Sequence, residues 1–362
     1  MGRNRIALSA TFLVPRIAKL WLVLAALVAA IMAALGGLVT GSGEASPAGR
    51  RAVEKVGPVV LAFGGDVHFE GILGSKLAAD PDRVLAPIAP VLGDADLAIV
   101  NLETAVTAGG APVAKQFAFK APPTAFAALR GGGVDVASMA NNHGLDYGTS
   151  GLRDSLAAAK RYRFPVIGIG LDAKQAYRPF RRTINGQRIA VIGATQVLDD
   201  ELISAWTAGP RKPGLASAKE VPRLVREVRN ARATADTVVV FLHWGVELDQ
   251  CPTADQRTLA RQLVAAGADV VVGGHAHRLQ GAGRMGNALV GYGLGNLAWY
   301  GTSELSTQTG VLFVTVTGRK VNSYRWAPAR IVGGVPRRLA GAERRRELSS
   351  WRSLRGCTGL EP

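Results

Sequence analysis

Residues 266–281 read AGADVVVGGHAHRLQG, and this stretch decides the fold class. Its apolar run 269–272 is short, rich in valine and followed by two glycines, which predicts a buried strand. The preceding segment, 253–266, predicts a helix that begins at Thr253, with Gln256 in capping-box spacing, and stops at Gly267. A helix followed directly by a buried strand is typical of α/β proteins.

The same alternation extends along the chain from this unit. Seven further short apolar runs, each bounded by turn residues, predict buried strands at 59–63, 97–100, 134–139, 166–169, 189–192, 237–242 and 288–292. Helix-like segments occur between them at 151–162 and 219–233. Runs 311–316 and 321–326 flank Gly318 as the strands of an antiparallel hairpin would. We therefore expect an α/β fold whose buried sheets are covered by helices.

Length and composition exclude several classes of protein. The chain has 362 residues, of which 48% are apolar and 19% charged, so a largely disordered or collagen-like chain is excluded. The two cysteines, Cys251 and Cys357, cannot form a cysteine-only zinc site. A disulfide between them is permitted in an exported protein, although the sequence does not show that they meet. Any metal site must therefore use His, Asp, Glu and Asn.

The amino-terminal region predicts export. Residues 20–43 carry no charge, and 20–40 are long and apolar enough to span a bilayer as one helix. Basic residues in 1–19 favour a cytoplasmic amino terminus and place the rest of the chain outside the cytoplasm. We expect a retained signal-anchor at 20–40 in the cell membrane, followed by a linker at 41–57. A cleaved signal peptide, which would make the protein secreted, is the alternative.

The positive charge of the chain is concentrated in part at its carboxyl terminus. The formal net charge is +16, and arginines recur through 329–362, which we expect to be a basic tail after a main domain at 58–328. Such a tail is either a solvated surface segment or a segment attracted to anionic lipid headgroups or wall polymers. Nucleic acid is not an expected partner, because the chain carries an export signal and no interleaved aromatic platform.

Histidines occur where the predicted strands end. All five follow an apolar run within a few residues: His68, His143, His243, His275 and His277. Loops at strand ends build the active sites of α/β folds. One histidine alone would more often be structural, but D-x-H, N-H and H-x-H arrangements at strand ends together predict a metal site. Imidazole combined with carboxylate or amide oxygen suits Mn, Fe, Zn or Co.

These motifs resemble a known family. The strings are GGDV at 64–67, VNLET at 100–104, ANNHGLDYG at 140–148, LHWGVE at 242–247, AGADVVVGGHAHRLQG at 266–281 and GLGN at 293–296. In this order they resemble the calcineurin-like metallophosphoesterases, and more closely the CapA branch, the capsule and poly-γ-glutamate synthesis proteins. The resemblance covers 58–300 and implies a four-layer α/β/β/α sandwich with two divalent metal ions, Mn, Fe or Zn, at the strand ends.

The resemblance also implies roles for individual residues. Asp66, His68 and His277 would bind the first metal. Asn142, His243 and His275 would bind the second. His143 would lie near the leaving group as a general acid or transition-state stabiliser. Two ions about 3.5–4 Å apart can activate a hydroxide and hold phosphoryl oxygens.

The sequence departs from the superfamily pattern at one ligand. The bridging carboxylate normally comes from a Gly-Asp pair after the second strand, where this chain has Val-Asn-Leu-Glu. Glu103 is the nearest carboxylate and our candidate for the bridge. Asp146 either hydrogen-bonds His143 or caps a loop. Arg278 is either a surface charge or a fork for an anionic substrate.

Three functions are consistent with these observations. The first is an exported, membrane-anchored metal-dependent hydrolase of the phosphoesterase type, acting on or for an anionic envelope polymer such as poly-γ-glutamate. The second is a non-catalytic subunit that binds or guides the polymer within a membrane synthesis complex. The third is amide hydrolysis of the polymer, since the ligands do not select the electrophile.

Overall fold

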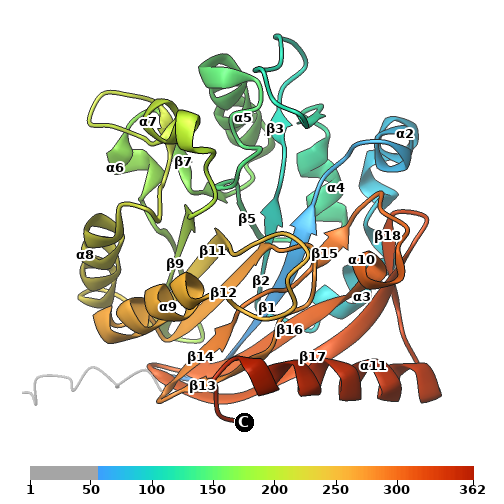
Figure 1. The fold of residues 1–362 in the computed structure, drawn as a ribbon, viewed down its shortest axis with the longest axis vertical. Helices are drawn as coiled ribbons and strands as arrows, with labels where there is room; N and C mark the ends of the chain where they lie inside the picture. Colours follow the sequence, from blue (N-terminus) through green and yellow to red (C-terminus); the bar gives the residue numbers. More distant parts are fainter. Residues whose placement is uncertain (1–55) are drawn as a thin grey trace, which may run out of the picture. The chain divides into compact units, whose positions relative to one another are not determined.

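Two β-sheets packed face to face form the centre of the computed structural model, which describes residues 56–362 (Figure 1). The expected segments 1–19 and 20–40, and most of the linker 41–57, lie outside the described residues. Within 56–362, no helix combines the length and the apolar character needed to cross a bilayer.

The first sheet is mixed and has the order β18-β17-β16-β1-β2-β5-β6, with β15 paired to the end of β1. Its strands are β1 (Val59–Val67), β2 (Leu97–Leu102), β5 (Val136–Ser138), β6 (Val166–Ile167), β15 (Asn296–Ala298), β16 (Gln308–Thr317), β17 (Lys320–Val332) and β18 (Val335–Arg338). Strands β1, β2, β5 and β6 are parallel, whereas β16, β17 and β18 continue the sheet as antiparallel strands.

The second sheet has the order β13-β14-β12-β11-β9-β8. Its strands are β8 (Phe180–Ile184), β9 (Gln187–Thr195), β11 (Thr237–Trp244), β12 (Val270–His275), β13 (Ala282–Met285) and β14 (Ala288–Gly291). The four inner strands are parallel, and all their residues except Arg188 are buried, because helices cover one face and the first sheet covers the other. Two small ladders join β3 (Ala105–Val106) to β4 (Lys120–Ala121) and β7 (Ile169–Gly170) to β10 (Gly214–Leu215).

Three apolar clusters separate four layers. One contains side chains of both sheets, such as Ile99 and Phe241, and lies between them. The second joins the outer face of the first sheet to α2 (Ile72–Ala79), α3 (Ala89–Leu92), α4 (Ala125–Gly131) and α5 (Gly148–Tyr162). The third joins the outer face of the second sheet to α6 (Ala173–Ala176), α8 (Val221–Arg232) and α9 (Ala254–Ala266). The expected α/β/β/α layering is therefore present.

Shorter elements complete the chain. The remaining helices are α7 (Ile203–Trp206), α10 (Glu304–Thr307) and α11 (Gly341–Ser353), with 3-10 turns η1 (Pro81–Arg83), η2 (Ala86–Ile88), η3 (Asp200–Leu202) and η4 (Leu354–Cys357). The capping box of α9 is confirmed, since Thr253 accepts from the N–H of Gln256 and the Gln256 side chain accepts from the N–H of Thr253.

Most expected strands are confirmed, but two boundaries differ. The run 166–169 is split into β6 and β7 at Gly168, where φ is +85° and an added Cβ would lie 2.4 Å from Ala140 Cβ. The boundary expected at 328 is wrong, because it falls inside β17. Residues 329–362 complete β17 and form β18 and α11, and the stacked rings of Trp326 and Trp351 hold α11 against the sheet. The hydrophobic contact of Trp351 makes this segment part of the fold, although its exposed side chains are basic.

The carboxyl ends of the parallel strands of both sheets meet at one edge of the sandwich. At this edge, residues at the ends of β1, β2 and β5 in the first sheet lie close to residues at the ends of β11 and β12 in the second sheet. This edge gathers side chains from far apart in the sequence and holds the candidate site.

Candidate metal centre

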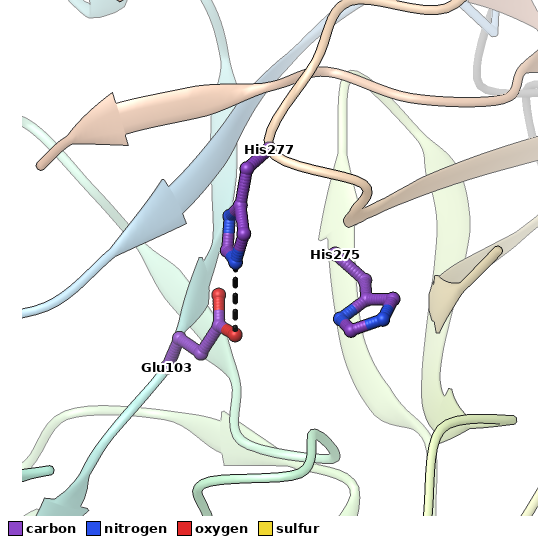
Figure 2. Close-up of side chains that lie close together, drawn as sticks. All are labelled: Glu103, His275 and His277. Carbon is purple, nitrogen blue, oxygen red and sulfur yellow. Dashed lines mark ion pairs between the residues drawn. The ribbon is translucent and has the colours of Figure 1, made fainter. Parts of the chain in front are cut away.

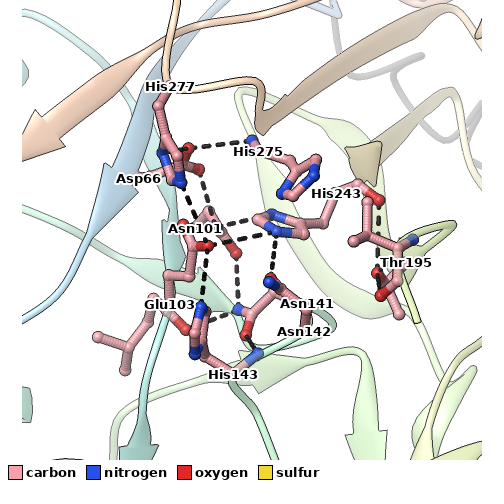
Figure 3. Close-up of polar contacts among 12 residues, drawn as sticks. Asp66, Asn101, Glu103, Asn141, Asn142, His143, Thr195, His243, His275 and His277 are labelled. Atoms are coloured by element: carbon pink, nitrogen blue, oxygen red, sulfur yellow. Dashed lines mark hydrogen bonds and ion pairs between the residues drawn. The ribbon is translucent and has the colours of Figure 1, made fainter. Parts of the chain in front are cut away.

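Four strand ends supply five polar side chains of the site (Figure 3). Asp66 lies near the end of β1, Glu103 follows β2, and His243 lies on β11. His275 ends β12, and His277 lies two residues later. Apart from His277, whose side chain is 13% exposed, these groups are at most 5% exposed. Charged groups at this depth need a partner of opposite charge, and a metal ion is one such partner.

Glu103 has an oxygen without a hydrogen-bond partner. Its Oε1 is fully buried and accepts no hydrogen bond from the described residues. Three ring nitrogens surround it: His243 Nε2 at 3.4 Å, His277 Nε2 at 3.9 Å and His143 Nε2 at 3.9 Å. Figure 2 shows His277 pointing directly at this carboxylate, with His275 beside it. Buried polar atoms are seldom left unpaired, so this arrangement fits a bound cation between the carboxylate and the imidazoles.

Glu103 is the common member of two clusters of candidate ligand atoms. One cluster is Glu103, His275 and His277, and the other is Asp66, Glu103 and His243; within each, the ligand atoms lie within 4.8 Å of one another. The residues expected to share an ion also lie together: His277 Nδ1 is 3.3 Å from Asp66 Oδ2, and the ring centroids of His243 and His275 are 4.7 Å apart. The shared position of Glu103 agrees with the expected bridge, which remains a prediction. His275 Nδ1 is also buried without a hydrogen-bond partner among the described residues.

Asp66 and His277 influence each other's charge. Burial alone would raise the pKa of Asp66, but the hydrogen bond and charge of His277, the charge of His243 and the N–H of His275 lower it to about 2. Burial alone would lower the pKa of His277, but Glu103 and Asp66 raise it to about 9. His277 Nδ1 lies 3.3 Å from Asp66 Oδ2 and 2.9 Å from Asn296 Oδ1. The carboxylates of Asp66 and Glu103 therefore favour a positive charge at the position of the His277 ring. A bound metal cation would be favoured there for the same reason.

The backbone after β12 is shaped around Asp66. The N–H of His275 donates to Asp66 Oδ2 at 3.0 Å, and His275 itself has a φ of +97°, which is strained for a residue with a Cβ. At Gly274, an added Cβ would lie 2.1 Å from Asp66 Oδ1. Because Gly274 has no Cβ, the chain can approach the carboxylate closely at this turn.

Two asparagines that sequence reasoning left without a role organise the centre. Asn101 Nδ2 lies 2.8 Å from Asp66 Oδ1, 3.1 Å from His243 Nδ1 and 3.4 Å from Glu103 Oε2. Asn141 Nδ2 donates to Asn101 Oδ1 at 2.9 Å, which fixes the orientation of the Asn101 amide. A sequence signal for Asn101 existed, because it directly follows the predicted strand 97–100 and stands two residues before Glu103.

Asn142, expected as a ligand, contacts His243. Its Oδ1 lies 2.8 Å from His243 Nε2. When Asn101 donates to Nδ1 of the ring, Nε2 carries the hydrogen and donates to this oxygen. Asn142 Oδ1 and His243 Nε2 therefore lie close enough to be two ligands of one ion.

His143 lies beside the ligands and is held by Asp146. Its Nδ1 lies 2.5 Å from Asp146 Oδ2, and Asp146 also accepts from the N–H of Phe119 at 2.7 Å and from Lys115 Nζ at 2.8 Å. The Phe119 ring stacks on the His143 ring at 4.0 Å. Of the two expected roles of Asp146, hydrogen bonding to His143 is the one observed. The contribution of Lys115 carried no sequence signal that we identified.

A pocket of about 390 Å³ opens beside His143 and Asn142. Its rim carries three acids, Asp199, Glu201 and Glu247, and one lysine, Lys115. His143 therefore borders an open pocket whose charged lining groups are mostly acidic.

His68 and Arg278 have contacts other than those expected. The two ring nitrogens of His68 face the N–H groups of Glu70 and Tyr300, both at 3.3 Å, and the ring packs on Trp299 at 4.1 Å. Burial and the charges of His277 and His143 lower its pKa to about 3. His68 is absent from both ligand clusters found among residues 56–362. Arg278 is half-buried and donates to the carbonyl of His277 at 3.4 Å, and its role toward an anionic substrate remains a prediction.

Comparisons with known proteins agree with the motifs. A 34% identical match over 176 residues, 48% of this chain and 42% of the relative, is to the "Capsule biosynthesis protein CapA" of Bacillus anthracis. A 29% identical match over 221 residues, 60% of this chain and 57% of the relative, is to the "PGA biosynthesis protein CapA" of Bacillus subtilis (strain 168). The chain thus spans about half the length of the curated relatives it matches.

Among solved structures, a 5'-nucleotidase from Candida albicans superposes with a TM-score of 0.45 and 10% identity, covering 82% of this chain and 58% of that one. The family model described as "Bacterial capsule synthesis protein PGA_cap" matches residues 60–300, about two thirds of the chain. The resemblance to CapA seen in the motifs is therefore confirmed. The chain belongs to the bacterial capsule synthesis protein (PGA_cap) family.

Proposed function

We propose that this protein is a metal-dependent hydrolase of the phosphoesterase type that acts in the synthesis of capsule, poly-γ-glutamate or a related anionic envelope polymer. The observation that carries the proposal is the buried, unpartnered Oε1 of Glu103, which faces the ring nitrogens of His143, His243 and His277. We propose two divalent transition metal ions, Mn, Fe or Zn, as the partners of this oxygen.

The residues of this chain have distinct tasks in the proposed reaction. Asp66, Glu103, His243, His275 and His277 would hold the ions, with Asn142 as an amide ligand. Bound divalent ions would supply Lewis-acid chemistry at this place, activating water and polarising a phosphoryl group. Asn101 would fix the orientation of Asp66 and His243 by donating to both.

His143 is placed to handle the proton of the leaving group. It borders the open pocket, and its Nδ1 is held by the Asp146 carboxylate at 2.5 Å. The contact fixes the ring orientation and leaves Nε2 directed toward Glu103 and the ligands. A positioned imidazole of this kind typically contributes about 10²–10⁴-fold to a rate by general acid catalysis.

We further propose that the protein works outside the cytoplasm, anchored to the cell membrane by residues 20–40. The Cys251–Cys357 disulfide supports an oxidising compartment. Subunits of a membrane synthesis complex are proposed partners, because the relatives' names refer to capsule and PGA biosynthesis.

One observation favours a second function, a non-catalytic polymer-binding subunit. Asn101 lies where β2 faces Asp66, so a neutral amide occupies the place nearest to the first carboxylate. An amide binds a metal more weakly than a carboxylate. A weakly held or single ion would leave a binding site without hydrolysis.

Metal content and turnover, measured together, test these functions. The full chain and its Glu103→Gln variant are loaded with Mn, Fe or Zn, and metal per chain is measured alongside hydrolysis of phosphomonoesters, phosphodiesters and a γ-glutamyl amide. Glu343→Gln on exposed α11 is the matched control. We expect two ions per wild-type chain, loss of at least one in Glu103→Gln, and ester hydrolysis that disappears with the ions.

The outcomes separate the proposals. Metal binding without turnover on any ester or amide would favour the binding subunit, and turnover on the amide alone would favour amide hydrolysis. Wild-type protein without metal after loading with all three ions would refute the metal centre itself.

A further inference from the structure

Two adjoining hollows lie on surface elements that do not line the metal pocket. A hollow of about 830 Å³ is lined by α5, α6 and the segments around the edge strands β6 and β8. A second hollow of about 380 Å³ shares Arg163, Phe164, Pro165 and Phe180 with it, so the two are continuous. We call this surface the edge groove. It shares no lining residue with the pocket beside His143.

The edge groove is strongly basic. Arg153, Lys160, Arg163 and Arg178 line its larger part, and Arg130, Arg181 and Arg182 line its smaller part. Asp135 is the one acid among these lining residues, and its charge is offset by Arg182 Nη1 at 3.1 Å. Within residues 56–362, no ion pair involves Arg153, Lys160, Arg163, Arg178 or Arg181. Five cations therefore face solvent without a neutralising partner.

The floor of the edge groove is suited to an extended chain. Leu156, Phe164, Val166, Ile169 and Phe180 supply apolar surface between the cations. Strand β6 ends the first sheet and β8 ends the second, so each has one side without a strand partner among the described residues. Cations from α4, α5, β8 and the segments after α5 and α6 line the groove, which matches a ligand with repeated charges better than one small anion.

We propose that the edge groove binds an extended polycarboxylate chain and that it, rather than the acidic rim of the metal pocket, holds the anionic polymer. This rests on the proposed function for the identity of the polymer, but the binding itself requires neither a metal ion nor turnover. The exposed cations attract the carboxylates, and the apolar floor contacts the methylene groups between them. Because the attraction is between exposed charges, binding weakens as salt is raised.

Binding of poly-γ-glutamate to the metal-free full chain tests the proposal. The variant Arg153→Ala/Lys160→Ala/Arg178→Ala removes three unpaired cations of the groove. The control Arg344→Ala/Arg345→Ala/Arg346→Ala removes three exposed cations of α11, so both lose the same net charge. Each exposed pair contributes about two- to fourfold to affinity, so we expect about tenfold weaker binding in the groove variant. The control should remain within about twofold of wild type.

Three results would overturn the proposal. Equal weakening in both variants would assign the binding to net charge, and no binding by wild type at low salt would remove the site. Groove-dependent binding of polyphosphate or anionic lipid vesicles in preference to the polycarboxylate would assign the groove to another ligand. A tenfold loss confined to the groove variant supports the proposal even if no hydrolase activity is found.

Discussion

Asn101 lies opposite Asp66 in the register of β1 and β2 and donates its side-chain N–H to Asp66 Oδ1 at 2.8 Å. A neutral donor thus links two buried carboxylates, because the same amide nitrogen lies 3.4 Å from Glu103 Oε2. The amide lets both acids remain close without a third negative charge.

Asn101→Asp should make the stability of the folded protein depend on bound metal. A third buried carboxylate would repel Asp66 and Glu103, and an uncompensated buried charge costs about 3–5 kcal/mol. We expect a lower melting temperature without metal, and tighter metal binding than in wild type, measured by thermal unfolding and titration calorimetry. Asn230→Asp on exposed α8 is the control. Unchanged metal affinity in Asn101→Asp would argue against ions at this place.

Asp146→Asn should lower kcat without removing metal. The carboxylate holds His143 at 2.5 Å, and loss of such an orienting partner typically costs about 10- to 100-fold in activity. Steady-state kinetics and metal content on the same samples check this expectation. Asp154→Asn, which alters a hydrogen bond to Thr107, should leave kcat unchanged. Loss of metal in Asp146→Asn would instead make Asp146 part of the metal centre.

Gly274→Ala should disturb Asp66 directly. Its Cβ would lie 2.1 Å from Asp66 Oδ1, so the carboxylate or the backbone must move. Overpacking of this kind costs about 1–3 kcal/mol, and we expect weaker metal binding as well. Denaturant unfolding and metal titration provide the measurements. Gly109→Ala, where no atom lies within 4 Å, should change neither.

Reduction of the Cys251–Cys357 disulfide should destabilise the protein. The bond joins residues 106 positions apart and ties η4 to the loop after β11. Loss of a native disulfide typically lowers the free energy of unfolding by about 2–4 kcal/mol. Wild type should lose this amount when reductant is added during denaturant unfolding, whereas Cys251→Ser/Cys357→Ser should be insensitive to reductant. An equal response of both proteins would contradict the prediction.

Stability at low pH should depend on Asp236. Hydrogen bonds from Arg188 outweigh burial and lower the pKa of Asp236 from 3.8 to about 2. Because the folded pKa is the lower one, the contribution is complete above about pH 4 and is lost as the pH falls toward 2. Asp236→Asn should therefore lose less stability than wild type across this window, as measured by unfolding at each pH. Parallel pH profiles of the two proteins would contradict this assignment.

The sequence allowed much of the fold to be predicted because its signals are local. Thr253, Gln256 and Gly267 begin and end α9 as the capping rules predict, and the valine-rich run before His275 is buried on both faces. The expectation that 329–362 is a separate basic tail is wrong, because the signal that decides its place in the fold is not local. Its arginines dominate the composition, whereas its place in the fold depends on the contact of Trp351 with Trp326, which no local pattern reveals.

For the site, the sequence by itself determined which residue types stand at the strand ends: Asp66, Glu103, His143, His243, His275 and His277. Only the tertiary structure decided which of them face one another. It placed Glu103 among three imidazoles, turned His68 toward backbone N–H groups, and brought Asn101 between two carboxylates. The physical reason is that strand ends carry side chains in directions set by sheet register and by the strained turn after β12, and both depend on packing between segments far apart in the chain.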